Sequence, residues 1–90
     1  MKPIRWTDHA LRSLDDREID RANAEGVLTE PEHQISDPPG RRILMRRYHD
    51  AVLDQDMLLR MVVEDTPEEI VVVTIYKTSQ IRRYLKGLDP

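Results

Sequence analysis

Cysteine and phenylalanine are both absent from the 90 residues of this chain. Without cysteine the chain has no disulfide bond, no thiolate metal ligand and no cysteine nucleophile. No apolar run approaches the ~20 residues of a membrane-spanning helix, and the first residues lack the apolar stretch of a secretory signal. We therefore expect a cytoplasmic protein that contacts no membrane.

The length and composition are typical of one folded domain, residues 1–90, with a heavily charged surface. The net charge of −3 argues against a surface that binds nucleic acid over its whole area. The charge is uneven, however. Residues 1–40 carry five basic and nine acidic side chains, whereas residues 41–90 carry nine basic and eight acidic ones. This distribution allows a local basic face on an acidic protein.

Two short helices are predicted in the first third of the chain. Thr7 is a suitable N-cap, and the apolar stripe after it predicts a helix that ends in the charged run 15–18. Asp20 is suited to cap a second helix that runs to about residue 28 and is stopped by Pro31.

The rest of the chain is typical of strands and a final helix. After a Pro- and Gly-containing break at 36–40, β-type runs follow at 43–48, 57–63 and 70–76. A turn at Pro67 joins the last two into an antiparallel hairpin, and residues 32–35 suit an edge strand. Ser79 is expected to cap a helix whose apolar positions are Ile81, Tyr84, Leu85 and Leu88. The predicted fold class is α+β: two N-terminal helices packed on a three- to four-stranded antiparallel sheet, with a short C-terminal helix.

Three residues of the predicted sheet are candidates for contacts with a substrate. Arg60 interrupts an apolar strand, so its guanidinium either grips a phosphate or forms an ion pair with Glu64. In the last strand, alternation places Tyr76 on one face with Thr74 and Val72, and Lys77 on the other. Regular strand geometry therefore does not bring Tyr76 and Lys77 into one site.

His9 is the best candidate for a general base. RNA cleavage without metal needs a base for the 2′-hydroxyl, cations for the phosphate and an acid for the leaving oxygen. Imidazole titrates nearest neutral pH, and the spacing of three residues places His9 and Arg12 on the same helix side. The alternative is that His9 packs or bonds locally at the helix start.

No metal or cofactor is expected. The two other histidines, His33 and His49, fall in loop-like segments as ordinary surface residues, and no two histidines have metal-ligand spacing. The three glycines are isolated, so no glycine-rich loop is present to hold a nucleotide.

Short motifs resemble a small, largely uncharacterised bacterial domain. They have the form Thr-x-His-Ala-x-x-Arg, Arg-x-Ile and Val-Val-Thr-x-Tyr, and lie in segments 6–12, 17–19 and 71–79, with further likeness at 27–31 and 40–41. That domain is similar in layout to BrnT and, more distantly, to the RelE/ParE toxin superfamily. RelE-like relatives cut mRNA, usually in the ribosome, ParE-like relatives act on DNA gyrase, and both are neutralised by an antitoxin protein. The resemblance implies substrate contacts from the sheet and the C-terminal segment, where Arg82, Arg83 and Tyr84 lie.

The sequence thus predicts a toxin of a toxin–antitoxin pair that acts on RNA or the ribosome as a metal-independent endoribonuclease. The candidate catalytic residues are His9 and Arg12, and the candidate substrate contacts are Arg60, Tyr76, Lys77, Arg82 and Arg83. Two alternatives stay open: a non-catalytic module that binds protein or nucleic acid, and a homodimer formed through sheet edges. RelE-like mRNA cutters are usually strongly basic, and this chain departs from that pattern.

Overall fold

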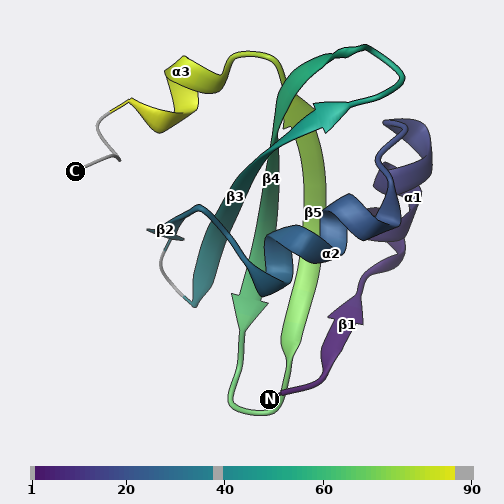
Figure 1. Ribbon diagram of the computed structural model, residues 1–90. Coiled ribbons are helices and arrows are strands. Elements are labelled where there is room, and N and C mark those ends of the chain that lie inside the picture. Colours follow the sequence, from purple (N-terminus) through teal and green to yellow (C-terminus); the bar gives the residue numbers. More distant parts are fainter. Residues whose placement is uncertain (1, 38–39, 87–90) are drawn as a thin grey trace.

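The part of the chain that the structure describes is built on one five-stranded sheet with three short helices (Figure 1). A computed structural model describes residues 2–37 and 40–86. The elements follow in the order β1 (Ile4–Trp6), α1 (Asp8–Asp16), α2 (Arg21–Thr29), β2 (His33–Asp37), β3 (Arg41–Asp50), β4 (Gln55–Asp65), β5 (Ile70–Thr78) and α3 (Ile81–Leu85). The strand order across the sheet is β1-β5-β4-β3-β2. No helix in the described part is long and apolar enough to cross a membrane.

The predicted fold class is wrong in the number and the direction of the strands. The sheet has five strands rather than three or four, and it is mixed, because β1 pairs with β5 in parallel from Ile4↔Ile70 to Trp6↔Val72. A strand of three residues is too short to show the alternation from which strands are recognised. The connection between β1 and β5 contains α1, α2 and the strands β2 to β4, so it is long enough for a parallel pair.

Both N-terminal helices begin at the predicted caps. The Thr7 hydroxyl oxygen accepts a hydrogen bond from the Ala10 N–H at 3.0 Å, and the Asp20 carboxylate accepts one from the Ala22 N–H at 3.0 Å. The predicted cap of α3 is wrong. Gln80 occupies the N-cap position of α3 and makes no side-chain capping bond. The predicted loop residues 38–39 and the apolar position Leu88 lie outside the described residues.

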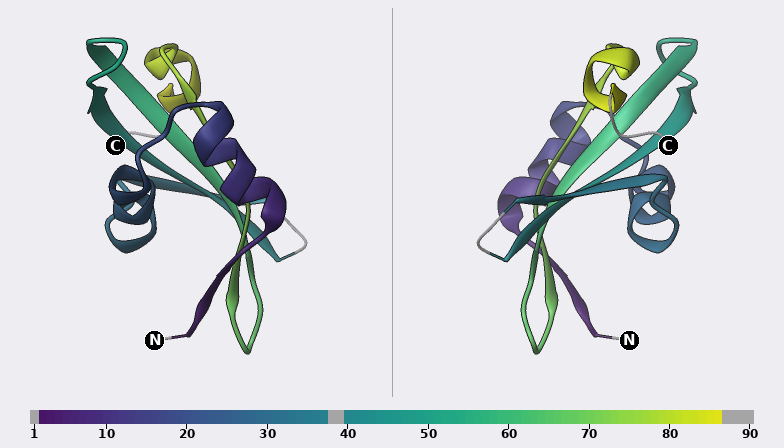
Figure 2. Two further views of the ribbon diagram at one scale, coloured as in Figure 1. Left: turned by 90° about the vertical axis from the view of Figure 1, so that its right-hand side faces the viewer. Right: turned by 90° about the vertical axis from the view of Figure 1, so that its left-hand side faces the viewer.

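The two faces of the sheet carry separate apolar clusters. The front face, toward the viewer in Figure 1, is covered by α1 and α2, whose buried residues pack on Leu44, Leu59, Met61, Val63 and Ile75. The back face carries a smaller cluster in which Ile81, Tyr84 and Leu85 of α3 pack on Met45 and Leu58. Figure 2 shows α2 and α3 on opposite sides of the twisted sheet. Since α3 is short, it covers only one end of the back face.

A β-bulge changes the direction of the side chains in β5. Val62 pairs with Thr74 but Val63 pairs with Val72, so Val73 is an extra residue. The bulge turns Val72 into the front core, which corrects the expectation that Val72 shares a face with Tyr76. Beyond the end of β1, α1 covers the outer edge of β5, and the Thr7 hydroxyl donates to the Val73 carbonyl oxygen at 3.0 Å.

Candidate functional site

Arg60 lies at the centre of β4 on the back face, between two tyrosines. It pairs with Met45 of β3 and with Tyr76 of β5 in the sheet register. Its guanidinium donates to the Tyr76 hydroxyl oxygen, and its Nε donates to Met45 Sδ at 3.4 Å. The guanidinium carbon lies 4.2 Å from the ring centre of Tyr84 and 5.5 Å from that of Tyr76. Stacking and hydrogen bonding therefore fix the orientation of this cation.

Arg60 has no carboxylate partner among the described residues. Glu64, the ion-pair partner that the sequence suggests, bonds instead to Arg41 of β3 at 2.8 Å. Arg60 is partly buried, and a cation with reduced access to water is costly when no anion balances it. A planar guanidinium with N–H groups left for an acceptor suits a bidentate bond to a phosphate.

His9 lies on the same side of the sheet, at the outer edge of β5. Its Nε2 is 3.1 Å from Thr74 Oγ1. Thr74 and Tyr76 are two residues apart on one strand face, which corresponds to about 7 Å along the strand. The imidazole, the Tyr76 hydroxyl and the Arg60 guanidinium thus follow one another across the back face.

Lys77 does not join this group. Arg12 is exposed on α1, one turn after His9. Lys77 points to the front face, as strand alternation predicts, and its ammonium donates to the Asp50 carboxylate at 2.7 Å and to the Glu18 carbonyl oxygen at 3.3 Å. The side chain of Asp50 is only 3% exposed and also accepts from the Tyr48 hydroxyl at 2.9 Å. Lys77 therefore serves a buried ion pair rather than the back face.

The Asp50 cluster predicts a specific dependence of stability on pH. The Lys77 ammonium, with help from the Leu53 N–H, holds the pKa of Asp50 well below its ordinary value. Because the folded-state pKa is depressed, the stabilisation is complete above the ordinary value of about 3.9 and is lost as the pH falls below it. We expect an Asp50→Asn variant to be less stable than the wild type at pH 7. The difference in urea unfolding midpoint between the wild type and Asp50→Asn should become smaller below about pH 4. A constant difference from pH 7 to pH 2 would contradict this assignment.

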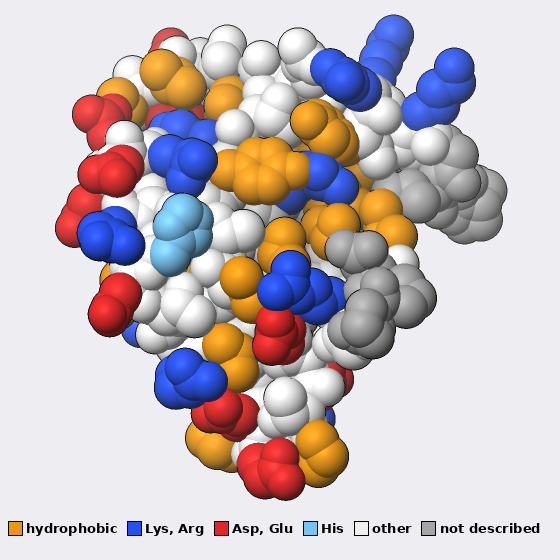
Figure 3. All heavy atoms as spheres, turned by 180° about the vertical axis from the view of Figure 1, so that it is seen from behind, with side chains coloured by type: hydrophobic (Ala, Val, Ile, Leu, Met, Phe, Trp, Pro, Cys, Tyr) orange, Lys and Arg blue, Asp and Glu red, His pale blue; other side chains and the backbone are white. Residues whose placement is uncertain are grey.

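A hollow of about 530 Å³ lies between α3 and the β3–β4 hairpin. Its lining includes Arg47, His49, Asp56, Ile81 and Arg82. Arg82 is one of the two α3 arginines that the sequence predicts to contact the substrate. The other, Arg83, donates to Gln80 Oε1 at 3.1 Å and lies 5.8 Å from the ring centre of Tyr84. Figure 3 shows basic side chains gathered over α3 on this face.

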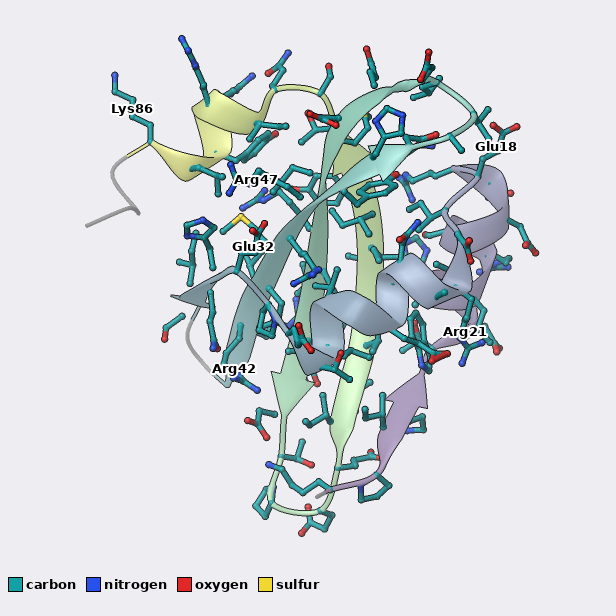
Figure 4. All side chains as sticks on the ribbon, in the orientation of Figure 1. Glu18, Arg21, Glu32, Arg42, Arg47 and Lys86 are labelled. Atoms are coloured by element: carbon teal, nitrogen blue, oxygen red, sulfur yellow. The ribbon has the colours of Figure 1, made fainter. Side chains whose placement is uncertain are left out.

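The charges that surround this hollow are partly balanced. Arg47 bonds to Glu32 of the segment before β2, and the two side chains face one another in Figure 4. The Arg47 N–H is the main reason that the pKa of Glu32 is lowered. His49 lies between the carboxylates of Asp56 and Asp54, at 3.2 and 3.1 Å, and their hydrogen bonds raise its pKa. Arg47 and His49 are therefore already paired with carboxylates, whereas Arg60 is not paired with one among the described residues.

The sequence interpretation missed three contributors to the back face. His49 is in β3 rather than in a loop, because that strand extends beyond its apolar run to Asp50. Thr74 is placed beside His9 by the bulge and by α1, which no local pattern reveals. Arg47 could have been found, since it belongs to a basic group in a strand. No cluster of three or more possible metal-ligand side chains occurs within 2–37 and 40–86.

The fold and the site define a small α+β domain with a cationic site on one sheet face. The chain belongs to a family of domains of unknown function, DUF4258, whose model matches residues 6–77. This agrees with the predicted resemblance to a small uncharacterised domain. No curated protein and no solved structure is significantly similar to the chain.

Proposed function

We propose that the back face of the sheet binds the phosphate backbone of RNA, and that the protein cuts RNA without a metal ion as the toxin of a toxin–antitoxin pair. One observation carries the proposal: Arg60 is a partly buried guanidinium held between Tyr76 and Tyr84, with no carboxylate partner among the described residues. The resemblance of the chain's motifs to BrnT and the RelE/ParE toxins supports the biological role.

The chemistry follows from the residues along the back face. His9 takes the proton of a ribose 2′-hydroxyl, and that oxygen attacks the adjacent phosphorus. The Arg60 guanidinium bonds to the non-bridging oxygens and stabilises the charge that develops there. The Tyr76 hydroxyl accepts from Arg60, so its own proton is available for the 5′-oxygen that leaves. The bond between phosphorus and that oxygen breaks, which leaves a 2′,3′-cyclic phosphate.

The acidic net charge is compatible with this proposal because the site is small. Binding of one or two nucleotides needs only a local cation and an aromatic platform rather than a basic surface. The ring of Tyr84 provides such a platform beside Arg60, and exposed basic residues on α3 extend it. Arg12 and Arg82 are the remaining candidates for longer-range phosphate contacts.

A His9→Gln variant tests the catalytic part of the proposal. With single-stranded RNA and EDTA, the purified wild type should produce fragments that end in 2′,3′-cyclic phosphate. Loss of the base should lower the rate by about 10²- to 10⁴-fold. RNA affinity should stay unchanged, because glutamine can still bond to Thr74. An Arg5→Gln variant, changed at an exposed ion pair with Glu69, is the matched control.

Other outcomes of that assay would contradict the proposal of a metal-independent ribonuclease. Binding of RNA without cleavage would favour the non-catalytic module, and cleavage only with added divalent cation would exclude the metal-independent mechanism.

The expected partner is a neutralising antitoxin protein. A homodimer through β2, an outer strand of the sheet, is a separate proposal that light scattering decides.

A further inference from the structure

The imidazole of His9 is held through one of its two ring nitrogens. Its Nε2 lies 3.1 Å from Thr74 Oγ1, at the outer edge of β5. Its Nδ1 has no hydrogen-bond partner among the residues that the structure describes, and His9 is exposed. A ribose hydroxyl that approaches the imidazole therefore meets Nδ1, because Thr74 already occupies Nε2.

The start of α1 fixes the contact between His9 and Thr74. The Thr7 N–H donates to the Val72 carbonyl oxygen at 3.1 Å, and the Thr7 hydroxyl donates to the Val73 carbonyl oxygen at 3.0 Å. These bonds join the start of α1 to the bulge in β5, and Figure 1 shows the helix beside that strand. His9 follows Thr7 by two residues and Thr74 follows Val73 directly, so both side chains extend from anchored backbone.

The direction of the hydrogen bond between His9 and Thr74 decides whether the imidazole can act as a base. A neutral imidazole carries hydrogen on one nitrogen and a lone pair on the other, and the bond made by one nitrogen sets the state of both. If Nε2–H donates to the Thr74 oxygen, the lone pair is on the open Nδ1. If the Thr74 hydroxyl donates to Nε2, Nδ1 carries the hydrogen and cannot take a proton.

We propose that Thr74 is a positioning residue for the base: its oxygen accepts from Nε2–H of His9 and thereby keeps the lone pair on Nδ1. Only this arrangement is compatible with His9 as the general base, so the inference rests on the proposed function. In the reaction the O–H bond of the 2′-hydroxyl breaks and an N–H bond forms at Nδ1. The bond from Nε2–H to Thr74 then has a charged donor and becomes stronger, so Thr74 also stabilises the imidazolium.

Nitrogen NMR of the isotope-labelled full chain tests the inference without RNA. At about pH 8, where an ordinary imidazole is neutral, couplings between ring nitrogens and carbon-bound ring hydrogens show which nitrogen carries hydrogen. The signals of His9 are those that His9→Gln lacks. We expect hydrogen on Nε2 in the wild type and in Thr74→Ser, and a mixture of both tautomers in Thr74→Val. Unchanged signals of His33 and His49 show that the variants are folded.

Cleavage kinetics connect this hydrogen bond to the reaction. Because Thr74 acts through His9 rather than by touching RNA, Thr74→Val should lower kcat about tenfold and leave KM unchanged. Thr74→Ser keeps the hydroxyl oxygen and should restore kcat. Thr29→Val is the matched control, since it removes an exposed hydroxyl from α2, on the opposite face of the sheet, and it should cleave as the wild type does.

Two results would overturn the inference: hydrogen on Nδ1 of His9 in the wild type, or equal kcat values for the wild type and a folded Thr74→Val. If Thr74→Val does not fold, the wild-type spectrum alone decides. Absence of RNA cleavage by the wild type is a separate failure. It contradicts the proposed ribonuclease, whereas the nitrogen spectra still decide whether Thr74 fixes the tautomer of His9.

Discussion

A Lys77→Met variant is expected to unfold about 15 °C below the wild type, because it leaves the Asp50 carboxylate buried without its cation. The lysine side chain is 12% exposed and the aspartate side chain 3%, so water cannot replace the lost partner well. The same ammonium also bonds to the Glu18 carbonyl oxygen, which ties β5 to the turn between α1 and α2. Thermal unfolding followed by circular dichroism at pH 7 measures the effect.

Two controls separate the ion pair from a general loss of charge. Lys86→Met, at an exposed position, should unfold within about 2 °C of the wild type. Adding Asp50→Asn to Lys77→Met should recover part of the loss, because removing both partners costs less than removing one. If Lys77→Met unfolds at the same temperature as the wild type, the ion pair between Lys77 and Asp50 does not stabilise the fold.

Local sequence rules succeed here where the interaction is local. Thr7 and Asp20 start the two helices because a cap acts within a few residues of itself. Alternation correctly separates Tyr76 from Lys77, since both follow the bulge in β5. The same rule fails for Val72, because one extra residue reverses every side chain on the far side of the bulge.

The rest of the fold depends on contacts that the sequence does not encode locally. The parallel pairing of β1 with β5 joins segments 66 residues apart at Ile4↔Ile70, through a strand of only three residues. Arg60 could be recognised as a candidate because it interrupts an apolar strand. The absence of an ion pair between Arg60 and Glu64, by contrast, depends on Arg41 of the neighbouring strand, which bonds to Glu64. The contact of His9 with Thr74 likewise depends on how α1 lies against β5.

Replacing Arg60 with glutamine is expected to lower the rate of RNA cleavage by about 10²- to 10³-fold. Glutamine keeps one donor for the phosphate but loses the positive charge and the planar pair of N–H groups. On induced expression in a bacterial host, the wild type should arrest growth and Arg60→Gln should not. Immunoblots must show equal amounts of the two proteins, and circular dichroism must show that both are folded.

Further variants identify which property of Arg60 matters. Arg60→Lys keeps the charge without the guanidinium, so it should restore only a small part of the activity. Tyr84→Phe keeps the aromatic face 4.2 Å from the guanidinium and should cleave almost as the wild type does, whereas Tyr84→Ala should not. Arg5→Gln, at the other end of the sheet, controls for the loss of one positive charge. Cleavage and growth arrest by Arg60→Gln at wild-type levels would show that the active site lies elsewhere. Among the described residues, no other arginine on this face has aromatic contacts on two sides and lacks a carboxylate partner.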